Sequence, residues 1–176
     1  MEIRSLLATD SLEDLTALLH AAYASLAVQG WNFTAVDQSV EVTRQRLAGA
    51  QCYVAVAGGQ LIGTVAVRGP KSGTELDPPD QAAWLYGMPG TALVSQFAVH
   101  PDWRGRGLGE RLMDTGEAWA MSRCFARAAL DTAAPAVALR KRYRRRGYIE
   151  VGEVQWAGKT YRSVLMLKRF DTLLAH

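Results

Sequence analysis

The sequence predicts an α/β fold in which a mixed β-sheet carries helices on both faces. Two observations support this fold class. Segments of alternating apolar and polar residues recur along the chain with segments of helical periodicity between them, and a glycine-rich turn joins one strand directly to one helix. The length of 176 residues, with 49% hydrophobic and 21% charged residues, suits a single globular domain over residues 1–176.

The first part of the chain predicts one strand and two helices. We expect a short strand over Glu2 to Leu7. Ser11 can cap a helix whose leucines recur at helical spacing, and Gly30 ends that helix. Asp37 can cap a second helix, which reaches about residue 48.

A β-hairpin and a long loop follow. Residues 52–57 and 61–68 alternate in polarity on either side of the turn at Gly58-Gly59, which is typical of a hairpin. Residues 69–90 contain four prolines and show little periodicity, so we expect a loop there, with a helical turn near Gln81 to Tyr86.

The second half of the chain alternates strands with helices. A helix that begins with Pro135 is expected to end at Gly147, and the turn at Ala157-Gly158 separates the last two strands. The expected elements are strand 92–99, a helix from 108, strand 126–131, helix 135–146 and strands 148–154 and 160–168. About seven strands and about four helices result, in the order β-α-α-β-β-β-α-β-α-β-β.

The bulk properties exclude several classes of protein. Cys52 and Cys124 are the only cysteines, and their spacing fits neither a zinc site nor a disulfide scaffold. The N-terminus lacks the pattern of a signal peptide, and no apolar run approaches the length of a membrane span. We therefore expect a cytoplasmic protein without a membrane partner. The net charge of +3 permits an anionic ligand without requiring one.

The run from Arg104 to Gly109 is the most informative motif. Its three glycines, at every second position, remove Cβ atoms where a backbone must approach a ligand closely. The run lies between a predicted strand and a predicted helix, whose free N–H groups and positive dipole end favour a phosphate. The run lacks the Gly-Lys-Ser/Thr of a P-loop, and Glu110 occupies the last glycine position of a dinucleotide fingerprint.

The motif Arg-x-x-Gly-x-Gly, preceded by Phe97-Ala98-Val99-His100-Pro101, resembles the core motif of the GNAT acyl-coenzyme A N-acyltransferases. The segment Tyr143 to Tyr148 is similar to the Tyr-x-x-x-Gly-Phe/Tyr segment of the same family. One helix and one strand separate the two motifs, as in the family. The resemblance implies a single GNAT-like domain that transfers an acetyl group from acetyl-coenzyme A (acetyl-CoA) to a primary amine.

The resemblance also implies roles for individual residues. Strand backbone would pair with the pantetheine arm, and the glycine run would hold the pyrophosphate with its N–H groups and arginine side chains. Tyr143 would protonate the leaving thiolate, as a phenol can. The implied coenzyme-binding residues are Phe97, Ala98, Val99, Arg104, Gly105, Arg106, Gly107, Leu108 and Gly109. Arg140, one helical turn before Tyr143, is a candidate for a coenzyme phosphate. The mechanism needs no metal.

The chain departs from the family at two points. Many relatives carry Asn seven residues before the tyrosine, where this chain has Ala136; Asp131 or Thr132, just after the predicted strand, can take over its contacts. A general base is also not evident. Glu75, Asp77 and Asp80 in the loop, His100 or a chain of water molecules are the alternatives.

The sequence says least about which amine is the acceptor and which partners the protein binds. Trp31, Phe33, Trp84 and Tyr86 can line an acceptor pocket or simply pack under loops, and Glu75 with its acidic neighbours favours a cationic acceptor, small molecule or peptide. The apolar C-terminal strand and residues 170–174 can support a homodimer or cover the chain's own core. The alternatives are a sensor that binds acetyl-CoA without catalysis and a nucleic-acid-binding module using the arginines of 140–146. The mild charge argues against nucleic acid, and a solvated helix face explains those arginines equally well.

Overall fold

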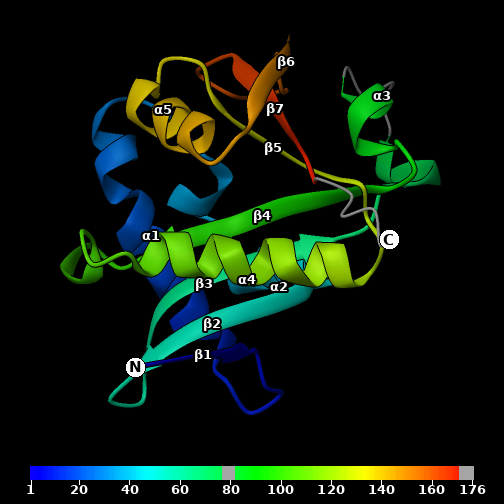
Figure 1. Ribbon diagram of the computed structural model, residues 1–176. Coiled ribbons are helices and arrows are strands. Elements are labelled where there is room, and N and C mark those ends of the chain that lie inside the picture. Colours follow the sequence, from blue (N-terminus) through cyan, green and yellow to red (C-terminus); the bar gives the residue numbers. More distant parts are fainter. Residues whose placement is uncertain (77–81, 171–176) are drawn as a thin grey trace. The chain divides into compact units, whose positions relative to one another are not determined.

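A computed structural model of the chain describes residues 1–76 and 82–170. Its strands form a seven-stranded mixed sheet in the order β1-β2-β3-β4-β5-β7-β6 (Figure 1). The chain divides into two compact units, one made of Met1–Arg68 and Val94–Ala118 and the other of Gly69–Leu93 and Trp119–His176. The expected α/β class and element order are confirmed, with one further short helix, α3.

The first unit contains the N-terminal strands and helices. Its elements are β1 (Glu2–Ser5), α1 (Leu12–Val28), α2 (Val40–Leu47), β2 (Gln51–Ala57), β3 (Gln60–Arg68), most of β4 (Thr91–Val99) and most of α4 (Leu108–Ser122), with 3₁₀ turns at Thr34–Val36 and Pro101–Trp103. β2 pairs antiparallel with both β1 and β3. The core lies between α1 and these strands, where Leu15 and Leu18 pack against Val54 and Ala66.

Helix α4 lies directly against β3 because a glycine allows it to come close (Figure 1). A Cβ atom at Gly116 would lie only 2.9 Å from Val67 Cγ2, which is nearer than real Cβ contacts allow. Leu108, Leu112 and Met113 of α4 are buried, as their spacing along one face of the helix predicts. The helix that follows the glycine run is therefore firmly seated.

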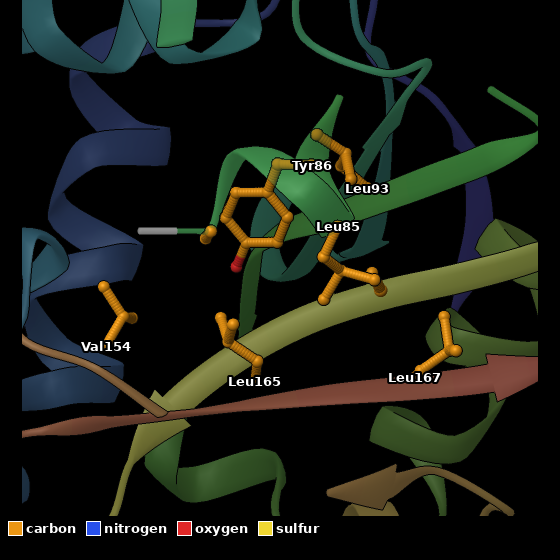
Figure 2. Close-up of a cluster of buried hydrophobic side chains, with 8 residues drawn as sticks. Leu85, Tyr86, Leu93, Val154, Leu165 and Leu167 are labelled. Atoms are coloured by element: carbon orange, nitrogen blue, oxygen red, sulfur yellow. The ribbon is translucent and has the colours of Figure 1, made fainter. Parts of the chain in front are cut away.

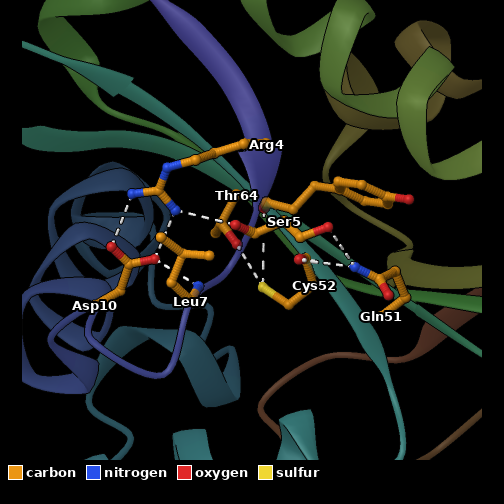
Figure 3. A network of polar contacts seen from close by, with 8 residues as sticks. Arg4, Ser5, Leu7, Asp10, Gln51, Cys52 and Thr64 are labelled. Atoms are coloured by element: carbon orange, nitrogen blue, oxygen red, sulfur yellow. Dashed lines mark hydrogen bonds and ion pairs between the residues drawn. The ribbon is translucent and has the colours of Figure 1, made fainter.

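An ion pair joins β1 to the start of α1 in the first unit (Figure 3). Arg4 donates to both carboxylate oxygens of Asp10 at 2.7 and 2.8 Å, and the N–H of Leu7 donates to the same carboxylate at 2.7 Å. The hydrogen bond from Arg4 holds the pKa of Asp10 below its ordinary value. Nearby, burial raises the pKa of the Cys52 thiol, which lies 3.5 Å from the Thr64 hydroxyl.

This ion pair predicts an acid-sensitive contribution to stability. Since the pKa of Asp10 is lowered on folding, its contribution is complete above the unfolded-state pKa of about 3.9 and is lost as the pH falls through the folded-state value. We expect Asp10→Asn to lower the melting temperature by a few degrees at pH 7 and by almost nothing near pH 2. Glu41→Gln is the matched control, since its ion pair with Arg44 is well exposed. Equal effects of the two substitutions at pH 7 would contradict this assignment.

The second unit contains the remaining elements. They are a 3₁₀ turn at Gly73–Leu76, α3 (Ala83–Tyr86), the start of β4, the end of α4, β5 (Arg127–Ala133), α5 (Val137–Arg145), β6 (Ile149–Val154) and β7 (Ser163–Arg169). β5 runs parallel to residues Thr91 to Leu93 of β4, and β7 pairs antiparallel with both β5 and β6. Figure 2 shows the core of this unit, in which Leu85 and Tyr86 pack with Leu93, Leu165 and Leu167.

Several expected boundaries were wrong. Ser39, not Asp37, caps α2, since its hydroxyl accepts from the N–H of Val42 at 3.2 Å while Asp37 ends the preceding 3₁₀ turn. β5 ends two residues later than expected, so Asp131 lies inside it, opposite Leu165 of β7. Helix α5 begins at Val137, and β7 begins at Ser163. The helical turn expected near residues 81–86 is α3, whereas Asp77 and Asp80 lie outside the described residues.

Candidate functional site

Strand β4 is interrupted by a backbone irregularity at Gln96. Its φ of +52° is unusual for a residue with a long side chain, particularly inside a strand. β4 does not show the expected alternation of burial, because Thr91 to Leu93 are all buried before this point and both Ala98 and Val99 are buried after it. Such a conformation persists only where the surroundings hold it.

Buried polar side chains hold Gln96 in this conformation. The Gln96 side-chain oxygen accepts from Arg46 Nε at 2.8 Å and from Arg46 Nη1 at 2.9 Å, since both arginine nitrogens are donors and the amide nitrogen cannot accept from them. The Gln38 amide lies 3.1 Å from the same side chain and donates to Thr43 Oγ1 at 2.7 Å. Thr43 Oγ1 in turn lies 2.7 Å from Thr16 Oγ1. This network ties α1 and α2 to the irregular point of β4.

The network predicts that Gln96 contributes to stability through its side chain. Gln96→Ala would leave the half-buried Arg46 and the buried Gln38 without this partner, so we expect the free energy of unfolding to fall by about 2 kcal/mol. Gln29→Ala is the control, since the exposed Gln29 makes only a 3.3 Å bond to Ser25 O. Urea denaturation of both variants measures the difference. A Gln96→Ala variant as stable as the control would contradict the role of the network.

The backbone after Gln96 leads to the glycine run. The Tyr23 hydroxyl donates to Phe97 O at 2.9 Å, and Arg104 Nε donates to Val99 O at 3.3 Å. Ala98 is buried and contributes to the core against α1. Phe97 O and Val99 O, which belong to the strand backbone expected to meet a pantetheine arm, therefore already have side-chain donors.

The turn before the glycines is shaped by local caps. His100 Nδ1 accepts from the N–H of Asp102 at 3.3 Å, and Pro101 begins the 3₁₀ turn that follows. The Arg104 guanidinium donates to Ala22 O of α1 at 2.5 Å as well as to Val99 O. Arg104 therefore fastens the loop to α1.

The glycine run itself is open. Gly105 and Gly107 have φ values of +72° and +73°, and an ideal Cβ at either would meet no atom within 4 Å. Arg106 lies over the Trp103 ring, with Cζ 5.1 Å from the ring centroid. The run enters α4 at Leu108, the buried first residue of that helix, so its backbone leads into the N-terminus of a 15-residue helix. This geometry suits an anion bound by N–H groups.

In the second unit, Tyr143 lies on α5 with a side chain that is 8% exposed. Its ring packs edge-to-face against Tyr148, with centroids 5.9 Å apart and planes at 65°. The N–H of Tyr148 donates to Tyr143 O at 3.1 Å, so the chain turns sharply around this pair after α5. The phenol is thus held by packing rather than extended into solvent.

Arg140 makes contacts that leave little of its guanidinium for a phosphate. It donates to both oxygens of Glu150 at 2.8 and 3.0 Å and to Ala134 O at 2.7 Å. The hydrogen bond from Arg140, with Arg144 nearby, holds the pKa of Glu150 below its ordinary value. A coenzyme phosphate would have to compete with these contacts. The same ion pairs neutralise part of the arginine run that a nucleic acid would need.

Asp131 is half-buried and is held by two aromatic donors. The Tyr86 hydroxyl donates to Oδ1, and Trp156 Nε1 donates to Oδ2 at 3.1 Å. The Tyr86 and Trp156 rings are stacked, with centroids 6.1 Å apart and planes at 17°. Sequence reasoning did not single out Trp156, whose only signal was an aromatic residue beside the turn at 157–158.

The other residues expected near an acceptor have structural contacts. Phe33 packs edge-to-face on Tyr23, with centroids 5.4 Å apart, and Trp31 is half-buried in the same connector of the first unit. In the second unit, Glu75 accepts from the N–H of Ser72 at 3.1 Å, and Trp84 on α3 is 50% exposed.

The described residues contain neither a candidate metal-binding cluster nor a helix suited to a membrane. Within residues 1–76 and 82–170, no group of three or more His, Cys, Asp or Glu side chains could hold a metal ion. In the same part of the chain, each helix is too short or too polar to cross a bilayer. A reaction without a metal remains a prediction.

Comparison with known proteins gives the family. A family model described as the acetyltransferase (GNAT) family matches residues 13–148, which is more than half of the chain. The chain belongs to this family. As a GNAT acetyltransferase, it uses acetyl-CoA and acts on an amine acceptor. No curated protein sequence matches the chain.

Solved structures agree with the GNAT fold. The chain is similar to the ribosomal-protein-alanine N-acetyltransferase from Brucella melitensis, with 26% identity, a TM-score of 0.65 and coverage of 97% of this chain and 100% of that one. It is also similar to the ribosomal-protein-S18-alanine N-acetyltransferase from Escherichia coli, with 16% identity, a TM-score of 0.70 and coverage of 96% of this chain and 92% of that one. A GNAT family acetyltransferase from Elizabethkingia anophelis with acetyl-CoA bound matches at 14% identity and a TM-score of 0.66, over 96% and 97% of the chains.

Proposed function

We propose that this GNAT acetyltransferase transfers the acetyl group to a primary amine by direct attack, with Tyr143 as the proton donor. The amine nitrogen forms a bond to the thioester carbonyl carbon, and the carbon–sulfur bond breaks. The leaving thiolate takes a proton from the Tyr143 phenol, and the amine nitrogen gives up a proton to a base. No metal takes part in this sequence.

The glycine run carries this proposal. Gly105 and Gly107 hold a conformation that exposes backbone, and the run leads into α4 with open space where side chains would lie. Backbone N–H groups there would bind the pyrophosphate of acetyl-CoA. Arg104 would act mainly by fastening the loop to α1, and Arg106 would supply positive charge from its place over Trp103.

The burial of Tyr143 supports its role as the acid. A phenol has a pKa of about 10 and a thiol one of about 8.5, so transfer of the proton from the phenol to the thiolate is uphill by about 1.5 pK units, about 2 kcal/mol, a cost that a positioned donor can meet. Packing against Tyr148 fixes the ring and leaves little freedom to the hydroxyl group. Among the groups considered as base, His100 and Glu75 already accept local backbone N–H groups. These bonds favour a base supplied by another group or by water.

Thermal denaturation with added ligand tests the donor side. Acetyl-CoA and free coenzyme A should both raise the melting temperature. A ligand at a hundred times its Kd increases the free energy of unfolding by about 2.7 kcal/mol. Failure of both ligands to stabilise the protein at millimolar concentration would overturn the proposed site. A panel of amines then tests the acceptor side. It should include diamines, an aminoglycoside and an alanine-containing peptide, since two structural neighbours are named ribosomal-protein-alanine or ribosomal-protein-S18-alanine N-acetyltransferase.

A further inference from the structure

The Asp131 carboxylate in the second unit accepts its hydrogen bonds from aromatic side chains. Both of its hydrogen-bond donors, the Tyr86 hydroxyl and the Trp156 indole N–H, are neutral groups. They fix the orientation of the carboxylate without cancelling its charge. Within the part of the chain that the structure describes, no cationic side chain forms an ion pair with Asp131. A charge in a half-buried place is normally paired with an opposite charge. The arrangement therefore points to a cation other than Asp131 and its two donors.

The aromatic rings around Asp131 also favour a cation. Tyr86 and Trp156 are stacked at 6.1 Å, and the faces of such rings attract positive charge. Lys71 gives a direct indication, since its Nζ lies 5.3 Å from the centroid of the Tyr86 ring. The backbone N–H of Lys71 also donates to Tyr86 O at 2.8 Å, which keeps the lysine beside the ring. A primary ammonium group of the chain itself therefore already lies on this aromatic surface.

Other ligands fit these residues less well. A carboxylate repels phosphate and other anions, so Asp131 is a poor choice for contacting a coenzyme phosphate. A metal ion would need several oxygen or nitrogen ligands, and within residues 1–76 and 82–170 no such group occurs. One carboxylate beside two stacked rings is suited to an ammonium group.

We infer that Asp131, Tyr86 and Trp156 bind a positively charged group of the acceptor that is separate from the amine being acetylated. The acceptor is then a diamine, a polyamine or another amine with a second cationic group. This inference rests on the proposed function, because it names the acceptor class of that reaction. Lys71 occupies the Tyr86 face in the absence of the acceptor and competes with it.

A matched pair of acceptors tests this inference by kinetics. 1,5-Diaminopentane and 5-amino-1-pentanol present the same reacting amine, and they differ in whether the remote group is charged. We expect kcat/KM for the diamine to be about tenfold higher, through a lower KM. Asp131→Asn, which keeps the size and can still accept hydrogen bonds, should bring the ratio of the two values close to one. Lys71→Met should increase the ratio.

Glu153→Gln provides the control for removal of a charge in the same unit. Glu153 lies on β6 and forms an exposed ion pair with Arg162 at 3.0 Å. The ratio for this variant should equal that of the wild type. The inference is wrong if the wild type shows no preference for the diamine, or if Asp131→Asn slows both acceptors equally.

A binding experiment separates this inference from the proposed function. The indole N–H resonance of Trp156, assigned with Trp156→Phe, should shift saturably on titration with 1,5-diaminopentane and should not shift with 1,5-pentanediol. The shift should be lost in Asp131→Asn. This result would support the cation site even if no acetyl transfer were detected. A Trp156 resonance that ignores the diamine, or responds equally in Asp131→Asn, would overturn the inference whatever the catalytic activity.

Discussion

Gly107→Ala should weaken acetyl-CoA binding by about tenfold or more while the protein stays folded. The φ of +73° at Gly107 costs an alanine about 1–2 kcal/mol, and the loop can relieve this strain only by moving the backbone N–H groups that would meet the pyrophosphate. No atom lies within 4 Å of the added Cβ, so no clash threatens the fold. Calorimetric titration with acetyl-CoA measures the change in Kd.

Gly58→Ala is the matched control for this substitution. Gly58 also has a positive φ, +55°, and its added Cβ would also meet no atom within 4 Å. It lies between β2 and β3, away from the glycine run in the sequence. Both variants should lose similar stability, but only Gly107→Ala should lose affinity. Equal affinity of the two variants for acetyl-CoA would contradict a phosphate-binding role for the run.

Tyr143→Phe should lower kcat by about 10²-fold or more and leave the KM for acetyl-CoA nearly unchanged. The substitution removes only the hydroxyl, so the thiolate must leave without a positioned proton donor. The packing of the ring on Tyr148 is preserved, which protects α5 and the turn after it. The loss should become smaller with an acyl donor whose thiolate is a better leaving group, since such a donor needs the proton less.

Tyr148→Phe separates this effect from general damage to the aromatic pair. Tyr148 is 1% exposed and forms the other half of the edge-to-face contact. Its substitution should change stability more than kcat. If Tyr148→Phe and Tyr143→Phe reduce kcat equally, or if Tyr143→Phe retains full activity, Tyr143 is not the proton donor.

The features that could be predicted from the sequence depend on residues that are close together along the chain. The run from Arg104 to Gly109 was recognised because the glycines, the strand before them and the helix after them are contiguous. The cap at Ser11 was predicted for the same reason, and the structure confirms it with a 3.0 Å bond from Asp14 N. The hairpin at Gly58-Gly59 likewise needs only its own residues.

The features that were missed depend on residues far apart in the chain. Tyr86, Asp131 and Trp156 meet because α3, β5 and the connection after β6 belong to one packed unit, and no local pattern indicates that pairing. Gln96 looks like an ordinary strand residue in the sequence. Its positive φ depends on partners such as Gln38, 58 residues earlier. Tertiary contacts here override the local preference.

Release of free thiol from acetyl-CoA, followed over time with and without a panel of amines, tests directly whether this protein catalyses acetyl transfer. We expect release that depends on both the amine and the enzyme, that saturates with acetyl-CoA, and that falls sharply in Tyr143→Phe. Protein that is stabilised by acetyl-CoA but releases no thiol with any amine would contradict catalysis and favour a sensor.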